Sequence, residues 1–339
     1  MDTSRIQLAH GGGGQLTAEL IRDVILPALG GGQDPHALAD AAVLETGGGR
    51  LAFTTDMYVV QPLEFPGGDI GKLAVCGTIN DLAVCGAKPL ALSMGLVLQE
   101  GLEIDLLQRV LDSAGRQARQ AGIRVVTGDT KVVERSALDG IIVNTSGVGL
   151  IGADVRLGFD RIQSGDRVVL SGPLGEHGLA VMSQRKGLSF TADLVSDCAP
   201  LHELVSDLLD ELGENLRFMR DPTRSGLAAV LADIAESRGV DIEIEESAIP
   251  AHRTARSAAE MLGLDLLQVA NEGKLVAVVA EGAARRAVDV MRRHAIGSRA
   301  AVIGTIGPAG ESPIVELATA AGGRRIVQMP YGEELPRIC

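Results

Sequence analysis

Five aspartates of this chain stand where an apolar segment meets a turn. Carboxylates that converge on one point repel each other unless cations lie between them. Hard oxygen ligands of this kind suit Mg²⁺, which bridges to nucleotide phosphates. One such aspartate alone is more often a helix cap or a turn residue, so the prediction of a magnesium site depends on the whole set. Its members are Asp40 (in ADAAVL), Asp56 (TTDM), Asp81 (INDLAVCGAKP), Asp129 (TGDTK) and Asp221 (RDPTRSG).

A run of glycines near the start is a second feature suited to phosphate. It consists of His10, Gly11, Gly12, Gly13 and Gly14. Glycine leaves the backbone N–H groups unhindered, so such a loop is able to lie over phosphates. The alternative is an N-terminal arm with no fixed position.

Two other phosphate motifs are incomplete. Lys72 and Lys274 each follow a Gly, but neither has the upstream Gly or the following Ser/Thr of a Walker A motif. Residues 147–152, GVGLIG, have the spacing GxGxxG. The ADVRLGFD that follows does not predict a helix, and a dinucleotide site needs that helix to hold the pyrophosphate.

The cysteines divide into three internal residues and one terminal residue. None of the four belongs to a CxxC motif or has metal-finger spacing. Cys76 and Cys85 stand in apolar sequence, which predicts buried small side chains. This usage is typical of a reducing compartment. Cys339 differs because only its own carboxylate follows the thiol.

Composition excludes several classes of protein. Hydrophobic residues make up 46% and charged residues 22%, which is globular and not disordered. The net charge of −13 argues against nucleic acid or an anionic membrane as a partner. No apolar run approaches the roughly 18 residues of a membrane span. Asp2 and the lack of an apolar h-region argue against a signal peptide, so we expect a cytoplasmic protein.

The elements that must position these residues are predicted to alternate along the first half. Apolar periodicity predicts strands at 50–60, 90–98, 123–127 and 140–150, and helices at 69–87 and 103–121. The second half repeats the mixture with strands at 167–171, 240–245, 274–280 and 300–306. Its helices are predicted near 176–186, 200–212, 226–237 and 282–295, and residues 311–329 contain two short strands.

Length and composition shifts divide the chain into two domains. At roughly 150 residues per domain, 339 residues favour two. We place an N-terminal domain at 1–152, a polar aperiodic linker at 153–166 and a C-terminal domain at 167–322. Residues 323–339 end in YGEELPRIC without periodicity and are predicted to form a mobile tail that carries Cys339.

Several of these segments, in this order, resemble the HypE family of hydrogenase maturation factors. That family belongs to the PurM-like ATPases, with aminoimidazole ribonucleotide synthetase, selenophosphate synthetase and thiamine-monophosphate kinase. The resemblance covers nearly the whole chain. Two positions depart from it: Ser225 replaces a usual Gly, and Ala39 replaces a frequent second acid, which leaves the number of metal ligands open. The segments are HGGGG, TTDMYVVQPLEFPGGDIGKLAVCGTINDLAVCGAKP, VTGDTKVV, DPTRSGL, NEG and PRIC.

The resemblance implies a fold and a reaction. The fold is α/β (α+β), with two PurM-like domains, a homodimer formed through the N-terminal sheet and a flexible C-terminal tail. A HypF-type carbamoyltransferase loads a carbamoyl group onto Cys339. The protein then uses ATP to dehydrate this S-carboxamide to a thiocyanate, and the cyanide passes to iron on a scaffold of HypC- and HypD-type partners.

The resemblance also implies residue roles. Cys339 is the carrier, Glu272 in Asn271-Glu272-Gly273 is the base, and Lys131 stabilises charge on the phosphoryl group or the carboxamide oxygen. The cofactors are ATP and Mg²⁺. The implied metal ligands are Asp40, Asp56, Asp81, Asp129 and Asp221. The implied nucleotide contacts are His10, Gly11, Gly12, Gly13, Gly14, Thr55, Asp56, Asp81, Asp129 and Asn144.

Two rival functions stay open at this point. One is another PurM-like ATP enzyme, such as a selenophosphate synthetase. That enzyme carries its reactive Cys or Sec in an N-terminal loop, and this chain has no Cys before Cys76. The other is a carrier without catalytic activity that only presents Cys339 to partners. The intact acidic motifs argue against it.

Overall fold

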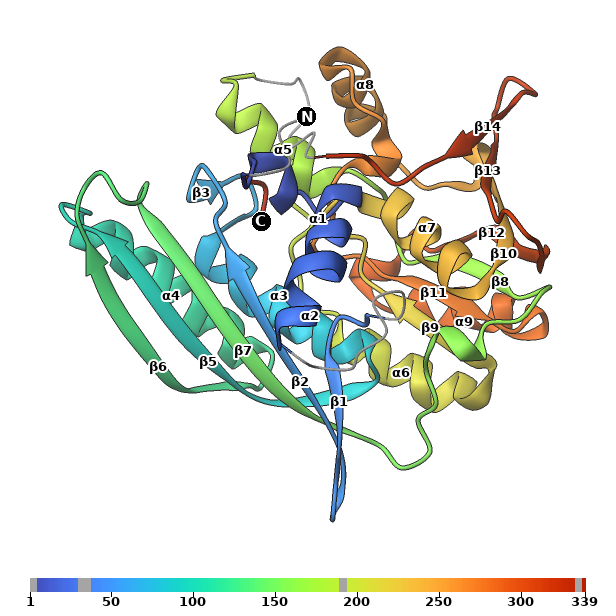
Figure 1. Cartoon of the computed structure of the whole chain (residues 1–339), viewed down its shortest axis with the longest axis horizontal. Coiled ribbons are helices and arrows are strands. Elements are labelled where there is room, and N and C mark those ends of the chain that lie inside the picture. Colours follow the sequence, from blue (N-terminus) through green and yellow to red (C-terminus); the bar gives the residue numbers. More distant parts are fainter. Residues whose placement is uncertain (1–4, 30–37, 189–193, 333–336) are drawn as a thin grey trace.

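The computed structural model describes residues 5–29, 38–188, 194–332 and 337–339. They form two α/β units, each built on one mixed sheet (Figure 1). This confirms the predicted fold class. The helices and strands below follow the order of the chain, and their bounds explain how the acidic residues are brought together.

The first sheet contains five strands in the order β1-β2-β7-β5-β6. All neighbours pair antiparallel except β5 and β6, which run parallel. Side chains alternate between its two faces, as in β7, where every second residue is buried. The strands are β1 (Ala42–Thr46), β2 (Gly49–Tyr58), β5 (Ala87–Gln99), β6 (Arg124–Val133) and β7 (Ile141–Ile151), and β3 (Glu64–Phe65) and β4 (Gly68–Asp69) form a separate ribbon.

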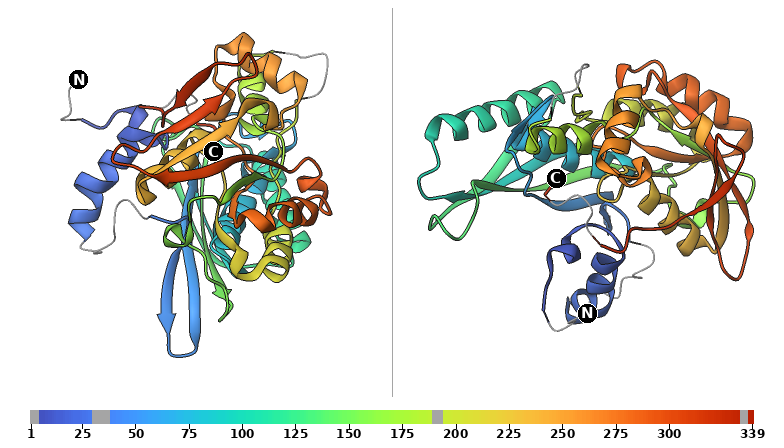
Figure 2. Two further views of the ribbon diagram at one scale, coloured as in Figure 1. Left: turned by 90° about the vertical axis from the view of Figure 1, so that its right-hand side faces the viewer. Right: turned by 90° about the horizontal axis from the view of Figure 1, so that it is seen from above.

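Helices α3 (Ile70–Val84) and α4 (Ile104–Gln120) cover one face of this sheet, as the right-hand view of Figure 2 shows. Asp69 caps α3, because its Oδ1 accepts hydrogen bonds from the N–H groups of Gly71 and Lys72. α3 is apolar nearly all round, since the first sheet covers one side and the second unit covers the other. Asn80 of α3 links the units by donating to the carbonyls of Ala199 and Glu272.

The opposite face of the first sheet, which we call the outer face, carries several exposed apolar side chains among polar ones. Cross-strand partners share a face of the sheet, so the strand register shows which residues belong to the outer face. Met57 is 66% exposed near the end of β2, beyond the last residue that pairs with β1. The large exposed apolar side chains of this face are Leu44, Phe53, Met57, Leu90 and Leu150.

The second sheet contains seven strands in the order β14-β13-β10-β12-β8-β11-β9. One core lies between this sheet and α7, and a second lies on its other side against α6 and α9. The strands are β8 (Arg167–Leu170), β9 (Leu216–Arg220), β10 (Val240–Glu245), β11 (Val276–Val279), β12 (Ala301–Ala309), β13 (Val315–Ala318) and β14 (Arg324–Val327). The helices are α5 (Glu176–Arg185), α6 (His202–Leu212), α7 (Gly226–Arg238), α8 (Arg253–Leu262) and α9 (Ala284–Met291).

The structure contains a helix or a strand at each position where the sequence predicts one. It also contains elements that the sequence did not predict. These are β1, β9, α8 and the N-terminal helices α1 (Gln15–Leu20) and α2 (Leu26–Leu29), which a π-helical turn at Ile21–Ile25 joins. The GVGLIG segment lies on strand β7 and not in a loop. A Cβ at Gly147 would lie 2.8 Å from atoms of Leu82 and Thr78, so this glycine allows α3 to pack closely on the sheet.

The predicted tail is shorter than 323–339, because β14 pairs with β13 inside the second sheet. The buried Ile162 within the predicted linker already belongs to the core of the second unit. Part of the glycine loop, the terminal residues 337–339 and α1 meet between the two units, where Figure 1 places the C-terminus. No helix of the described residues is long and apolar enough to cross a membrane.

Candidate active site

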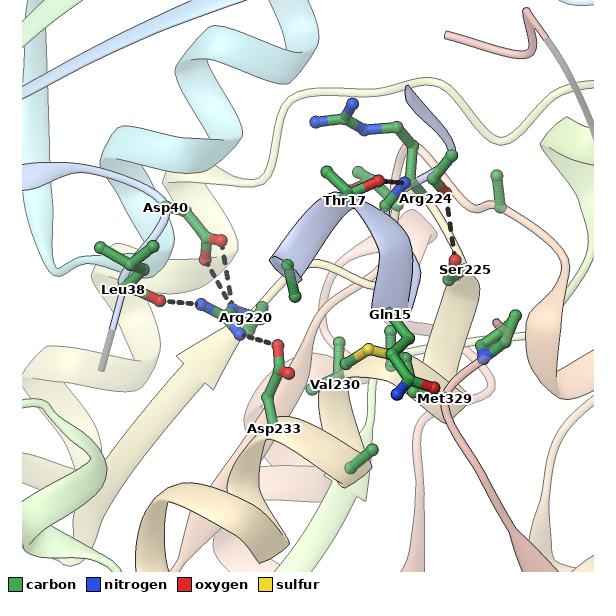
Figure 3. Close-up of a pocket in the computed structure, with 18 of the residues that line it drawn as sticks. Gln15, Thr17, Leu38, Asp40, Arg220, Arg224, Ser225, Val230, Asp233 and Met329 are labelled. Carbon is green, nitrogen blue, oxygen red and sulfur yellow. Dashed lines mark hydrogen bonds and ion pairs between the residues drawn. The ribbon is translucent and has the colours of Figure 1, made fainter. Parts of the chain in front are cut away.

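A cavity of about 1100 Å³ lies between the two units (Figure 3). Its wall includes the glycine loop, strand β2, helices α3 and α7, and the C-terminal residue. Six predicted site residues with reactive side chains meet around it. They are Asp40, Asp56, Asp81, Asp221, Glu272 and Cys339.

Asp81 of helix α3 forms a hydrogen bond that connects this helix to strand β2 of the first sheet. Thr54 and Asp56 share the inner face of β2, and the Thr54 hydroxyl lies 2.9 Å from Asp81 Oδ2 and 2.9 Å from the carbonyl oxygen of Asp40, so its one hydrogen is donated to either acceptor. Burial raises the pKa of Asp81 well above its usual value, and the carboxylates of Asp221, Asp56 and Asp40 raise it further. This repulsion shows that the pocket favours a cation.

Asp221 follows strand β9 and is 5% exposed. Its Oδ2 is buried and has no hydrogen-bond partner among the described residues. Burial raises the pKa of Asp221 well above its usual value, with Asp40 as the next cause. An unpartnered carboxylate oxygen in a wet acidic pocket suits a ligand that supplies positive charge.

Arg220, which the sequence analysis missed, partly balances this charge. Its guanidinium forms ion pairs with Asp40 at 3.1 Å and Asp233 at 2.7 Å (Figure 3). It also lies over the ring of Phe159, 5.4 Å from the centroid. Only the position of Arg220 next to Asp221, at the end of β9, could have drawn attention to it in the sequence. Its contacts Asp233 and Phe159 are distant from it along the chain.

Glu272 is held at the pocket wall by its neighbours in the chain. The side-chain amide of Asn271 donates to the carbonyls of Pro222 and Val269, and its Oδ1 accepts from the N–H of Gly175. Glu272 is 2% exposed, and its Oε1 has no hydrogen-bond partner among the described residues. Burial raises the pKa of Glu272 well above its usual value. A carboxylate of this kind is a stronger proton acceptor than an exposed one.

The glycine loop is docked on the second unit. Ser225 donates to the carbonyl of Gly12 at 3.1 Å, and Arg224 donates to the carbonyl of Gly11 at 3.2 Å. Gly13 has φ +76°, and a Cβ there would lie 2.6 Å from Arg224 Cβ. Ser225 itself adopts φ +60°, a conformation that suits the glycine usual in the family. Gly11, Gly12 and Gly13 line the cavity.

The C-terminal tip points into the same cavity. The N–H of Val59 donates to the terminal carboxylate of Cys339 at 3.1 Å, and the N–H of Gln61 donates to the carbonyl of Arg337 at 3.1 Å. Ile338 is 3% exposed. The negative charge at Cys339 raises the pKa of the Arg224 guanidinium. The described end of the tail is therefore held in place, in contrast to the predicted mobility.

Asp129, Lys131 and Asn144 do not reach this cavity within one chain, which corrects the expected convergence. The register places Asp129 in one row with Gly95, Asn144 and Met57 on the outer face. Asp129 pairs with Lys131 at 2.6 Å on the exposed sheet surface. The cause is the two-residue period of strands, which separates these side chains from Asp56 on the inner face.

Thr55 occupies the border between the two faces. It lies on the outer side of β2, where it accepts a hydrogen bond from the side-chain amide of Asn144 at 3.1 Å, and it also lines the cavity. Asn144 donates a second bond to the carbonyl of Asp56 at 2.9 Å. Asn144 thus supports the backbone of the pocket from behind. His10 lies outside the cavity lining, where its carbonyl accepts from Thr17 at 2.9 Å.

The described residues contain no group of three His, Cys, Asp or Glu side chains placed closely enough to hold a metal ion. The donor chemistry nevertheless fits a hard cation, because the buried oxygens of Asp221 and Glu272 lack partners and the neighbouring carboxylates repel one another. Hard oxygen donors of this kind suit Mg²⁺ with additional oxygen ligands from elsewhere.

Two family models match the chain. The N-terminal domain of AIR synthase related proteins matches residues 38–151, and the C-terminal domain of these proteins matches residues 163–315. Carbamoyl dehydratase HypE of Rhodobacter capsulatus is 48% identical over 337 residues, which cover 99% of this chain and 98% of the relative. Carbamoyl dehydratase HypE of Escherichia coli K12 is 44% identical over 99% of this chain and all of the relative.

This chain belongs to the HypE family. Its fold is therefore the two-domain PurM-like fold implied by the sequence. A solved HypE–HypF complex contains a chain with a TM-score of 0.86 and 42% identity, covering 92% of this chain and 99% of that one. A solved HypE in complex with ATP has a TM-score of 0.83 and 44% identity, covering 97% and 98%. These relatives do not favour the selenophosphate synthetase or the inactive carrier as alternatives.

Proposed function

We propose that this chain is an ATP-dependent carbamoyl dehydratase that converts an S-carboxamide on Cys339 into a thiocyanate. The observation that carries the proposal is the position of Cys339 at the wall of the acidic cavity that also contains Glu272. The HypE relative solved with ATP and the identity with carbamoyl dehydratases support it. The thiocyanate supplies a cyanide ligand for the iron of [NiFe]-hydrogenase.

The reaction needs the carboxamide oxygen to become a leaving group. This oxygen attacks the γ-phosphorus of ATP, the nitrogen loses one proton, and ADP leaves. Glu272 then takes the second proton from nitrogen while the C–O bond breaks and phosphate departs, leaving S–C≡N. The sum is one carboxamide and one ATP converted into one thiocyanate, one ADP, one phosphate and the two protons that leave nitrogen, the first to solvent and the second through Glu272.

Each side chain of the cavity has a part in this scheme. Asp40, Asp56, Asp81 and Asp221 would hold Mg²⁺ against the phosphates, which supply its remaining oxygen ligands. Gly11, Gly12 and Gly13 would cover the phosphates through backbone N–H groups. Mg²⁺ supplies charge stabilisation when bound. Arg224 lies close enough to Cys339 to favour negative charge on the carboxamide oxygen.

The test of the function is a mass measurement of the intact chain. The chain is incubated with carbamoyl phosphate, ATP and a HypF-type carbamoyltransferase. We expect the gain of one carbamoyl group at Cys339, followed by the loss of one water, and neither change in Cys339→Ala. A carbamoylated chain that never loses water in the presence of Mg-ATP would contradict the proposal.

The outer face supports a homodimer. Phe53 and Met57 are 45% and 66% exposed on this face, and an isolated chain would leave both side chains in water. A two-fold axis parallel to the strands would place β6 of one copy over β2 of the other. Asp129 and Lys131 would then reach the rim of the partner's cavity, where Thr55 lies. Both residues thus keep their proposed roles, but across the interface.

This arrangement is tested by mixing two inactive variants. Lys131→Ala and Asp81→Asn each damage every site in their own homodimers. Mixed dimers contain one intact site if Lys131 acts across the interface, so about a quarter of wild-type dehydration should return. No recovery in demonstrated mixed dimers would contradict it. Phe53→Glu should give monomers by sedimentation, whereas Ile104→Glu on exposed α4 should not.

The partners follow from the reaction. A HypE–HypF complex has been solved for relatives, and we propose a HypF-type enzyme as the source of the carbamoyl group. A HypC/HypD-type iron scaffold is the proposed acceptor of cyanide. The acidic net charge of −13 leaves nucleic acid as an unsuitable partner. A thiol carrier needs a reducing compartment, so we place the reaction in the cytoplasm.

A further inference from the structure

His177 is a fully buried histidine that the reaction scheme does not use. It is the second residue of α5 and has an exposed fraction of 0%. Its ring meets the ring of Phe65 edge-on, with 5.3 Å between centroids. Its two nitrogens have one partner each: Nδ1 is 2.8 Å from Ser196 Oγ, and Nε2 is 2.9 Å from the carbonyl oxygen of Ile338.

These partners fix the position of the ring proton. A carbonyl oxygen only accepts, so Nε2 must carry the hydrogen that is donated to Ile338. In the neutral ring Nδ1 is then an acceptor, and the Ser196 hydroxyl donates to it. The Ser196 oxygen accepts in turn from the N–H of Cys198 at 3.1 Å. Burial lowers the pKa of His177, in keeping with this neutral tautomer.

The histidine and the main chain of residues 59–61 both bind the tip. The carbonyl of Arg337 accepts from the N–H of Gln61, and the terminal carboxylate of Cys339 accepts from the N–H of Val59. The carbonyl of Ile338, between them, accepts from His177. Without His177 this buried carbonyl would lose its partner, at a cost that favours withdrawal of the tip.

The loop residue that orients His177 stands next to one that orients the base. Asp197 Oδ1 accepts from the N–H of Glu272 at 3.1 Å, and its Oδ2 pairs with the buried Lys274 at 2.9 Å. Ser196 and Asp197 therefore connect the tip and the base to the same loop segment. The distance between the carrier and Glu272 depends on this segment.

We propose that His177 is a positioning residue that holds the C-terminal tip in the cavity, and that Ser196 sets its tautomer. The catalytic meaning of this contact rests on the proposed dehydration. The docking of the tip does not depend on the dehydration, because docking is an equilibrium between the bound and the released positions of the tip. Loss of the hydrogen bond from His177 to the Ile338 carbonyl should increase the fraction of molecules in which the tip is released from the cavity.

The experiment measures the alkylation rate of Cys339 by iodoacetamide, read from the mass of the C-terminal peptide. His177→Leu should alkylate about 5–10-fold faster than wild type, the range for loss of one buried hydrogen bond. His177→Gln should return close to the wild-type rate, since its amide NH₂ takes the place of Nε2–H. His294→Leu, which loses a bond to Asp207 at 2.9 Å, is the matched control and should show no change.

A rate for His177→Leu equal to that of wild type would overturn the proposal, and so would equal acceleration by His294→Leu. If His177→Leu does not fold, Ser196→Ala serves instead, with an expected acceleration of about 2–5-fold. Iodoacetamide needs neither ATP nor a carbamoyl group. A normal alkylation pattern in a chain that never forms thiocyanate would therefore refute the proposed function alone.

Discussion

The main-chain N–H of Val59 donates a 3.1 Å hydrogen bond to the terminal carboxylate of Cys339, the last residue of the chain. The strand that carries Asp56 thus continues directly into the segment that binds the carrier. The terminal position matters here, because only the end of a chain enters a cavity without a second strand following it.

A folded tag appended after Cys339 should abolish thiocyanate formation, although the cysteine is still present. The tag would pull Ile338, which is 3% exposed, out of its contacts. The same tag before Met1 is the control and should have little effect, since Arg5, the first residue that the structure describes, is exposed. Thiocyanate formation at the untagged rate, measured by intact mass, would mean that the thiol reacts at an open surface.

Asp81→Asn should lower Mg²⁺-dependent ATP turnover at least ~100-fold, which corresponds to about 2.7 kcal/mol of transition-state stabilisation. The substitution removes a charge next to Asp221 and Asp56 but keeps the shape of the side chain. Thermal unfolding checks that the fold survives. Asp289→Asn on the exposed side of α9 is the matched control. Near-normal turnover by the Asp81 variant would remove this residue from the metal site.

The carboxyl cluster makes the stability of the ligand-free protein depend on pH. Burial raises the pKa of Asp81, Asp221 and Glu272 above the values of 3.8 for Asp and 4.5 for Glu. The folded state therefore keeps protons that the unfolded chain has lost. The contribution of these groups to the free energy of unfolding is greatest at low pH, and it falls as the pH rises from those values through the raised pKa values.

Asp221→Asn should reduce this pH dependence and raise the melting temperature at pH 8 by a few degrees, while ATP turnover is lost. The reason is that a neutral amide does not repel Asp40 and Asp81. Asp210→Asn on the exposed surface of α6 should change neither quantity. A melting temperature at pH 8 below that of wild type would show that Asp221 stabilises the ligand-free fold.

Glu272→Gln should separate loading of the carrier from dehydration. The variant should accept a carbamoyl group on Cys339, because this step takes place at the partner enzyme. It should not form thiocyanate, since an amide cannot take the nitrogen proton. Intact mass distinguishes the two products. Dehydration at the wild-type rate would assign the base to another residue.

The sequence predicted the strands that alternate regularly and the acidic residues that belong to motifs. β1 was missed because all five of its residues are exposed, so it has no alternation to detect. Arg220 and His177 were missed because their roles come from contacts with Asp40 and Ile338, far away in the chain. The separation of Asp129 from Asp56 depends on strand register, which local sequence does not determine.

The central claim is that ATP activates the carboxamide oxygen on Cys339, and the destination of this oxygen tests it most directly. The chain is carbamoylated with a group that carries a heavy oxygen isotope, separated from the carbamoyltransferase and given Mg-ATP. The account predicts that the label appears in the released phosphate, in an amount equal to the thiocyanate formed. Label in water, or thiocyanate formed without labelled phosphate, would contradict it.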